Sequence, residues 1–428
     1  MAIKCKRIAI FGNMKISAWI FLKMRRYLTN PLRSFIARHL PDVLKDAARG
    51  SLAHRLEDRI ITYRELTERP DVQSWRFSEA WSVEFGEPDY YNNIPAEITK
   101  LFGQHECHRP FVIEIPNGVI FGHNGFMTTD RGEYITFNFD RAEPHGDAAG
   151  ELAYEVVDEL GRGNWPLSPP SREKLPEVDC AIPLLHRWAT NYSHWTEEWL
   201  TQMEGLRYYA QETGYEPTLL IPPNPPSFVH DSLSVLGYDS DDYVEWGGGS
   251  IAVNRLVLPS IRRCRSCTSD DYMRDVSALK WLRDQILHEL SLPRGNVSGG
   301  GARILISREH DATTRRVVNW EDVQSALARH GFMTVQLTEM DFSEQKRLFS
   351  GAEMIVGVHG AGLTELIYAP EAAVIELYGD YMVPVYYEMA KGLNMPYACL
   401  KCDDKAGDLV VDLDELLAAV FRMEKLGS

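Results

Sequence analysis

A histidine, two glycines and a helix start stand together near the C-terminal end of the chain, in an arrangement that can bind phosphate. The run MIVGVHGAGLTELIYAP, residues 354–370, reads as an apolar strand, an HGAG turn at 359–362 and a helix opening with Thr364 and Glu365. Two glycines let backbone N–H groups approach an anion, and the helix N-terminus adds partial positive charge. The pattern predicts a phosphate site, although glycines also serve close packing of a helix on a strand.

Two more side chains are expected at the same edge of the sheet. Arg308 follows the strand RILIS, so its guanidinium can bind a diphosphate bidentately, and Arg315 can assist from the adjoining loop. Glu376 is expected at the end of the strand AVIELY, where a carboxylate can accept bonds from a ribose diol. Together these residues predict a nucleoside diphosphate. The plainer interpretations are a surface ion pair for Arg308 and an ordinary strand-end carboxylate for Glu376.

The run NYSHWTEEWL, residues 191–200, places three polar side chains at a spacing typical of one helix face. Asn191, His194 and Glu198 stand at positions i, i+3 and i+7. A carboxylate four residues after a histidine can orient the imidazole and keep it basic, so that it accepts a proton from a hydroxyl group. A histidine with satisfied hydrogen bonds at an interface is the plainer interpretation. The spacing predicts a general base at His194 with Glu198 as its partner.

The composition limits the possible partners. The 428 residues include 61 acidic and 45 basic side chains, giving a formal charge of −16, so a nucleic-acid ligand is not expected. Arginine outnumbers lysine 32 to 13. An acidic, lysine-poor chain favours a salt-loving source, such as a halophilic archaeon. An ordinary acidic cytoplasmic enzyme is the alternative.

Positive charge is concentrated at the start of the chain. Eight basic residues and no acidic residue fall within the first 34 positions, around an apolar run at about 16–24. That run is shorter than the roughly 20 residues that cross a bilayer, so we do not expect it to span one. Segment 1–50 is expected either to lie on the inner face of the plasma membrane or to form a strand and helix of the first domain.

Seven cysteines favour reduced thiols in a cytosolic setting. Two pairs, Cys264 with Cys267 and Cys399 with Cys402, have CxxC spacing, but more than 130 residues separate them. Structural zinc sites usually separate such pairs by about 15–20 residues. We therefore expect incidental thiols in preference to a zinc site.

The order of apolar segments predicts an α/β protein. Residues 110–139 read as short strands joined by Asn-Gly and Gly turns, and helical spacing runs from about Ala181 to Gln211. From 303 to 378 strands and helices alternate, and the strands are fully apolar, which predicts a doubly wound parallel sheet. The turn at 359–362 does not complete G-x-G-x-x-G, so hydride transfer with a nicotinamide cofactor is the weaker interpretation.

The stretch 304–377 resembles glycosyltransferase family 61. The matching motifs are an arginine after the first strand, NWEDV, FSEQKRLF, GVHGAGLT and AVIEL, and the upstream NYSHW resembles the N-x-x-H motif of that family. Two positions depart from the pattern. Glu365 stands where the family usually has Asn, and Trp320 separates Asn319 from Glu321.

The resemblance implies a GT-B-like fold, with two Rossmann-like doubly wound domains facing a cleft and a β-rich N-terminal element. The expected divisions are 1–50, an acceptor-side domain at 51–270 and a nucleotide-sugar domain at 271–428. It also implies an inverting, metal-independent glycosyltransferase without a cofactor. Its base would be His194, aided by Asn191 and Glu198. The residues expected to bind the donor are Ser307, Arg308, Arg315, His359, Gly360, Ala361, Gly362, Leu363, Thr364 and Glu376.

The expected acceptors are a glycan, a lipid-linked glycan or a protein. If the basic segment 1–50 lies on the membrane, a lipid-linked glycan is the leading acceptor, which would place the protein in cell-surface glycan assembly on the cytoplasmic face. Glu365 puts a negative charge near the expected phosphate site. For that reason a protein that binds nucleotide without turnover remains the main alternative, and an NAD-linked oxidoreductase remains the third.

Overall fold

The computed structural model describes most of the chain after residue 52. The described residues are 53–136, 169–265, 272–293, 301–309 and 313–427, apart from Arg55, together with Leu152, Ala153, Glu155, Val156 and Glu159. They form two compact units. The first takes residues up to 73, 114–187 and 246–257, and the second takes 74–113, 188–245 and 258–428. The sequence placed one boundary near residue 270, whereas the units interleave along the chain; the expected basic segment 1–50 lies outside the described residues.

The first unit contains a mixed sheet. Its strand order is β1-β8-β7-β6-β12-β9. The bounds are β1 (Ile60–Thr62), β8 (Tyr134–Thr136), β7 (Phe126–Thr128), β6 (Phe111–Phe121), β12 (Ser250–Pro259) and β9 (Glu177–Pro183). β6, β7 and β8 pair antiparallel, and the β6–β7 turn at 122–125 contains Asn124-Gly125. This confirms the hairpins predicted from residue 110 as far as residue 136. The short helix α4 (Tyr63–Thr67) follows β1 and begins with a capping box from Thr62 to Glu65.

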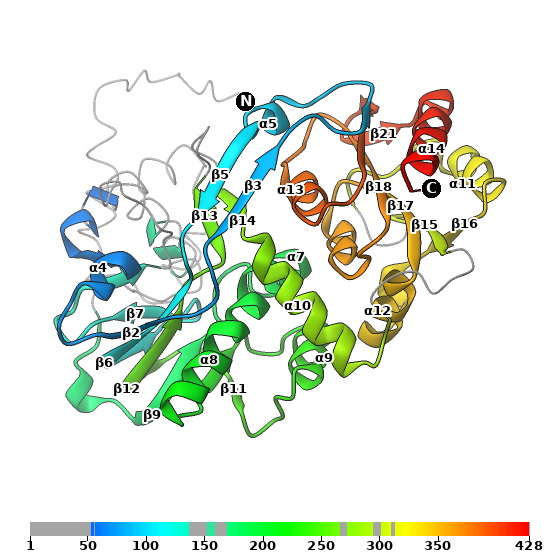
Figure 1. Cartoon of the computed structure of the whole chain (residues 1–428). Coiled ribbons are helices and arrows are strands. Elements are labelled where there is room, and N and C mark those ends of the chain that lie inside the picture. The colour runs from blue at the N-terminus through cyan, green and yellow to red at the C-terminus, as the bar shows by residue number, and fades with distance from the viewer. Residues whose placement is uncertain are drawn as a thin grey trace, which may run out of the picture. The chain divides into compact units, whose positions relative to one another are not determined.

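The second unit is built on a six-stranded, fully parallel sheet (Figure 1). Its strand order is β16-β15-β17-β18-β19-β4. The bounds are β16 (Phe332–Val335), β15 (Ala302–Ile306), β17 (Ala352–Val358), β18 (Ala373–Tyr378), β19 (Tyr397–Lys401) and β4 (Tyr90–Tyr91). The central strands are buried on both faces, as their continuous apolar runs require. The predicted parallel sheet is confirmed, and so is the mixed α/β class.

Helices cover this sheet. The core between the sheet and helices α11 (Trp320–Ala328) and α14 (Leu413–Gly427) includes Val323, Val356, Ile375 and Leu416. The helices α12 (Phe342–Ser350) and α13 (Val385–Gly392) both contact the segment η7 (Ala361–Tyr368). Within the described residues, no helix combines the length and apolar content needed to cross a membrane.

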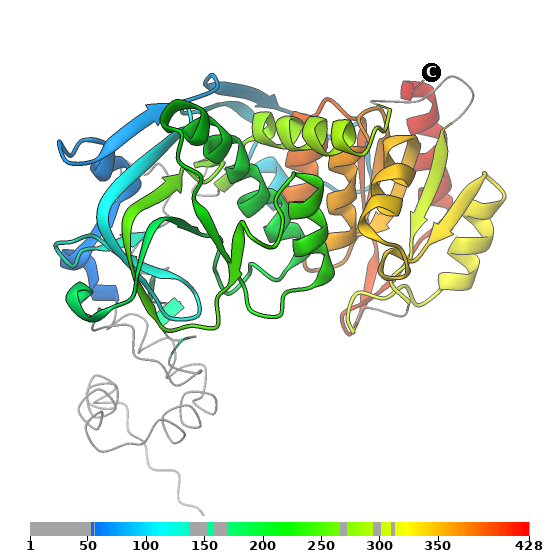
Figure 2. The same cartoon turned by 90° about the horizontal axis from the view of Figure 1, so that it is seen from below.

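The remaining elements of the second unit hold the segment that carries His194. α10 (Val276–Glu289) packs against α8 (Met203–Thr213) and α9 (Ser227–Val235), as Figure 2 shows. Gly214 ends α8 in a left-handed conformation that favours glycine. The paired strands are β10 (Thr218–Ile221) with β11 (Tyr243–Glu245), β3 (Trp81–Phe85) with β5 (Gly103–Cys107), β13 (Arg263–Arg265) with β14 (Tyr272–Arg274), and β20 (Asp403–Lys405) with β21 (Asp408–Val410).

Two expected helix limits are wrong. The helical segment predicted from Ala181 starts at Tyr192, because residues 177–183 pair as β9 beside β12. The helix predicted after Gly362 is a 3₁₀-helix that already begins at Ala361 and carries Thr364 and Glu365 in its interior. Its tighter winding suits a short connection between two parallel strands.

Candidate functional site

The helix that carries His194 begins with a side-chain cap. Asn191 precedes α7 (Tyr192–His194), and its Oδ1 accepts hydrogen bonds from the backbone N–H groups of Ser193 and His194, at 3.1 and 3.4 Å. Asn191 is exposed and stands before the first helical turn. Its expected place on one helix face with His194 and Glu198 is therefore wrong, because an N-cap residue adopts extended backbone angles. In this structure Asn191 fixes where the helix starts.

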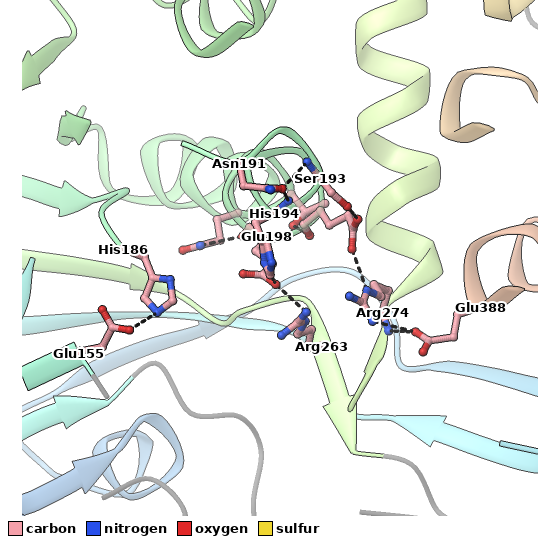
Figure 3. A network of polar contacts seen from close by, with 12 residues as sticks. Glu155, His186, Asn191, Ser193, His194, Glu198, Arg263, Arg274 and Glu388 are labelled. Carbon is pink, nitrogen blue, oxygen red and sulfur yellow. Dashed lines mark hydrogen bonds and ion pairs between the residues drawn. The ribbon is translucent and has the colours of Figure 1, made fainter. Parts of the chain in front are cut away.

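His194 and Glu198 meet as the spacing predicted. His194 Nδ1 lies 2.9 Å from Glu198 Oε1 (Figure 3), and Glu198 belongs to the π-helical turn η4 (Trp195–Trp199) that follows α7. Trp188 stacks on the imidazole, with ring centroids 5.7 Å apart. The His194 side chain is one-third exposed. Its Nδ1 is occupied by the carboxylate, so Nε2 is the atom left to exchange a proton with a ligand.

Arg263 keeps Glu198 ionised. Its Nη2 lies 2.6 Å from Glu198 Oε1, on the carboxylate that His194 also contacts. Burial raises the pKa of Glu198, but the charge of Arg263 and the bond to His194 outweigh it and lower that pKa to about 2. A carboxylate that is ionised at neutral pH beside Nδ1 favours the tautomer with the proton on Nδ1, which leaves the Nε2 lone pair available.

A second chain of hydrogen bonds and ion pairs starts from the same helical segment. Ser193 donates to Glu197, Glu197 Oε2 lies 2.7 Å from Arg274 Nε, and Arg274 Nη1 lies 3.4 Å from Glu388 Oε2 (Figure 3). Burial raises the pKa of Glu388 to about 7, against the opposing charge of Arg274. The chain ties α7 and η4 to β14 and α13. Figure 3 also draws a separate pair within the first unit, His186 Nε2 with Glu155 Oε1 at 3.1 Å.

His359 also pairs with a carboxylate, but deep inside the second unit. Its Nδ1 bonds to Glu376 Oε1 at 2.5 Å, and Tyr397 donates its hydroxyl proton to Glu376 Oε2. His359 is 2% exposed and Glu376 is fully buried. Glu376 was expected at a strand end, where it could reach a ribose. That position is wrong, because Glu376 lies within β18 and both of its oxygens are used by His359 and Tyr397.

The HGAG turn holds Arg308 at close range. Gly360 has extended backbone angles, but a Cβ there would overlap Nη1 of Arg308. A Cβ on Gly362 would stand 3.1 Å from Leu337 Cδ1 and 3.2 Å from Ile306 Cγ2. Gly360 thus leaves space for the guanidinium, and Gly362 allows close packing on β15. Arg315 Nη1 donates to the carbonyl of His359 at 2.8 Å, so it supports the turn.

A cavity of about 460 Å³ lies at the carboxyl ends of β15 and β17. This is where ligands bind in open parallel sheets. Its wall includes Ser307, Arg308, Ala361 and Gly362 of the expected donor-binding set. The other residues that line it are Tyr192, Ser227, Phe228, Asp231, Ile306, Leu337, Thr338, Met340, Phe342, Gln345 and Val358.

The other expected donor-binding residues stand outside that lining. Leu363 is 1% exposed and Thr364 is fully buried, so the side chains of these two η7 residues lie in the interior of the unit. His359 and Glu376 lie behind the strand ends, and Arg315 contacts the backbone of the turn. Asn319 bonds through its side-chain amide to the backbone of Val411 at 2.9 and 3.0 Å, so it joins α11 to the segment before α14.

Glu365 is neutralised by a lysine that the sequence analysis did not identify. Lys346 Nζ lies 2.7 and 2.9 Å from the two oxygens of Glu365, and both side chains are fully buried. Lys346 also donates to the Tyr192 hydroxyl at 2.6 Å. The charge that cast doubt on phosphate binding is therefore compensated. A glutamate inside the apolar run GLTELIYAP does signal a buried cation nearby, but the sequence cannot say which one.

The cysteines are only partly as expected. Cys399 and Cys402 are buried free thiols, and burial raises the pKa of both. Cys107 is disulfide-bonded, so the expectation that all seven thiols are reduced is wrong. Cys267 lies outside the described residues. Among those that are described, no group of three or more His, Cys, Asp and Glu side chains could hold a metal ion.

Comparison with known proteins bears on this region of the chain. The sequence profile of the family described as Glycosyltransferase 61 matches residues 192–375. That match starts at Tyr192, at the first turn of α7, and ends inside β18, so it includes His194, the cavity-lining segments and the HGAG turn. Residues 192–375, somewhat less than half of the chain, are therefore similar to glycosyltransferase family 61. The resemblance found in the sequence is thereby confirmed, and the source organism stays a prediction.

Curated relatives of this segment are glycosyltransferases by name. The EGF domain-specific O-linked N-acetylglucosamine transferase of Gallus gallus is 30% identical over 119 residues, which cover 26% of this chain and 22% of that protein. A beta-1,2-xylosyltransferase of Oryza sativa subsp. japonica is 34% identical over 148 residues, covering 32% and 24%. The matched part therefore spans about a quarter of the length of these relatives.

Proposed function

We propose that this chain transfers a sugar from a nucleotide-sugar to an acceptor hydroxyl, with inversion at the anomeric carbon and without a metal ion. The observation that carries the proposal is the one-third exposed His194 with its Nδ1 on an ionised Glu198, in the same unit as a cavity at parallel strand ends. The match of residues 192–375 to the family 61 profile and the names of the relatives support the reaction class.

In the proposed reaction, the acceptor oxygen attacks C1 of the sugar while the bond from C1 to the diphosphate oxygen breaks. The acceptor proton passes to His194 Nε2, and the electron pair leaves with the nucleoside diphosphate. One displacement on the face opposite the leaving group inverts the anomeric centre. Glu198 stabilises the resulting imidazolium, since its own carboxyl stays ionised at neutral pH.

Arg308 is proposed to receive the charge of the leaving diphosphate. It lines the cavity with Ser307, and Gly360 gives its guanidinium room to lie against the turn. A preorganised cation that meets developing charge supplies the electrostatic stabilisation that a divalent ion gives in other enzymes. His359 and Glu376 are proposed to hold the turn in shape from behind, through their mutual bond.

The test is turnover by the full chain. The purified protein is offered a panel of nucleotide-sugars with glycan, lipid-linked glycan and peptide acceptors, and product mass and released nucleoside diphosphate are measured. We expect one donor to give a glycosylated product with inverted configuration by NMR, undiminished by EDTA. Arg308→Ala should raise the KM for that donor about 10- to 100-fold, the loss of a charge-assisted bond. Absence of both product and diphosphate release across the panel would reject the proposal.

The rival proposal, nucleotide binding without turnover, rested on the negative charge of Glu365. The pairing of Glu365 with Lys346 removes that reason. An acceptor in cell-surface glycan assembly and a location at the inner membrane face both remain predictions from the N-terminal charge.

A further inference from the structure

Three side chains from three elements meet beside the cavity. Tyr192 belongs to α7, Lys346 to α12 and Glu365 to η7. η7 contacts both of these helices. Tyr192 itself lines the cavity, as do Phe342 and Gln345 from the same helix as Lys346.

Every hydrogen-bonding atom of this group is used within it. The Lys346 ammonium has three N–H donors, and it has three acceptors: the Tyr192 hydroxyl at 2.6 Å and the two Glu365 oxygens at 2.7 and 2.9 Å. The Tyr192 hydroxyl in turn donates to Glu365 Oε1. The three groups therefore form a closed set of bonds that fits one relative placement of α7, α12 and η7.

The surroundings exclude water from this set. Lys346 Nζ lies 4.2, 4.5 and 5.1 Å from the ring centroids of Phe342, Tyr368 and Tyr192. Burying two charges costs desolvation energy, and apolar side chains of similar volume are often as stable or more stable. Stability alone therefore does not explain the pair. Its directional bonds to Tyr192 supply what apolar packing lacks, a defined position for one hydroxyl group.

We propose that Tyr192, Lys346 and Glu365 are positioning residues that hold the start of α7, and with it His194, in register with the cavity wall. Tyr192 stands two residues before His194 and also packs edge-on against Phe228, another wall residue, with centroids 5.3 Å apart. This inference rests on the proposed function of His194. It adds two residues, Lys346 and Glu365, that are too deeply buried to touch a ligand.

The first test removes one hydroxyl. Tyr192→Phe keeps the ring in the wall but frees the start of α7 from the ion pair. We expect kcat to fall about 10- to 100-fold, as small misplacements of reacting groups do, while the Kd for nucleoside diphosphate stays within twofold. An unchanged kcat, or a Kd that rises in step with the loss, would overturn the proposal, since the second result would make Tyr192 a ligand contact.

The second test replaces the ion pair by apolar side chains. Lys346→Met with Glu365→Leu avoids leaving one charge buried alone, so the protein should keep its Tm. We expect the same loss of kcat as for Tyr192→Phe, and no further loss when all three changes are combined, because they break one coupling. Additive losses would contradict a shared role.

A readout independent of turnover separates this inference from the proposed function. Hydrogen exchange of the amides in 192–199 should accelerate in both variants, because α7 loses its anchor. Unchanged exchange would overturn the inference even if the enzyme proves active. If the wild-type protein transfers no sugar but exchange is still faster in the variants, the anchor is supported and only the reaction is rejected.

Discussion

Two of the histidine–carboxylate pairs in the second unit use the same histidine nitrogen and differ in environment. His194 with Glu198 and His359 with Glu376 both join Nδ1 to a carboxylate oxygen. His194 is one-third exposed and its carboxylate is held by Arg263. His359 is 2% exposed, with the rings of Tyr381 and Tyr386 at 5.5 and 5.3 Å. The first pair can exchange a proton with a ligand, whereas the second is placed to hold a turn.

This comparison teaches that the residue pair alone does not define a role. Access to Nε2 and the partner of the carboxylate decide it. A cation on Glu198 keeps that carboxylate ionised, while a phenol on Glu376 completes a buried set of hydrogen bonds. The same chemistry thus serves as a base in one place and as a support in the other.

The largest expected effect separates the two histidines. His194→Ala should lower kcat about 10³-fold, in the range that general bases contribute, with nucleoside diphosphate affinity and Tm unchanged. His359→Ala should instead lower the free energy of unfolding by about 2 kcal/mol, since Glu376 loses a buried partner. Steady-state kinetics and urea unfolding of both variants measure this. Equal kinetic losses with equal stability losses would erase the distinction.

An intermediate effect is expected at Glu198. Glu198→Gln should lower kcat about 10²-fold, because the amide no longer stabilises an imidazolium. The folded pKa of about 2 lies below the ordinary 4.5, so this carboxylate stabilises the fold above pH 4.5 and loses that contribution as pH falls toward 2. Unfolding measured between pH 2 and 5 should therefore depend less on pH in the variant. A variant with the wild-type acid profile would contradict this role for Arg263.

The smallest effect is expected at Glu388, the far end of the second chain of hydrogen bonds and ion pairs. Its folded pKa of about 7 lies above the ordinary 4.5, so its contribution to stability is complete below pH 4.5 and is lost as pH rises through 7. We expect about 2 kcal/mol of such loss in the wild type and none of it in Glu388→Gln, with kcat within threefold. Urea unfolding at pH 5, 6 and 7 checks the slope, and a parallel slope in the variant would refute it.

Much of the sheet and the link from His194 to Glu198 could be predicted from the sequence, because both depend on local periodicity. Continuous apolar strands at 302–306, 352–358 and 373–378 indicate a parallel sheet by themselves. The burial of Glu376 and the 3₁₀ form of the segment after Gly362 were missed, because neither follows from local periodicity. Glu376 is paired with Tyr397, a partner 21 residues further along the chain.

The partners of the buried charges could not be predicted either. Arg263 and Lys346 stand 65 and 19 residues from the glutamates they neutralise, and no periodicity links them. The strand β4 joins the edge of the parallel sheet from residues 90–91, far upstream of the other strands. All of these contacts lie within the second unit and join segments that are distant in the sequence.

The closed set of bonds around Lys346 has a consequence for how this sequence can vary. A change at Lys346 alone or at Glu365 alone leaves an unpaired charge in an apolar interior. The resulting loss of stability is large enough to be removed by selection. The residues at the two positions should therefore be substituted together in evolution. Homologues with asparagine at the position of Glu365 should carry an uncharged residue at the position of Lys346. An alignment of close homologues would reveal that covariation, and the pair would then mark a distinct branch within the family.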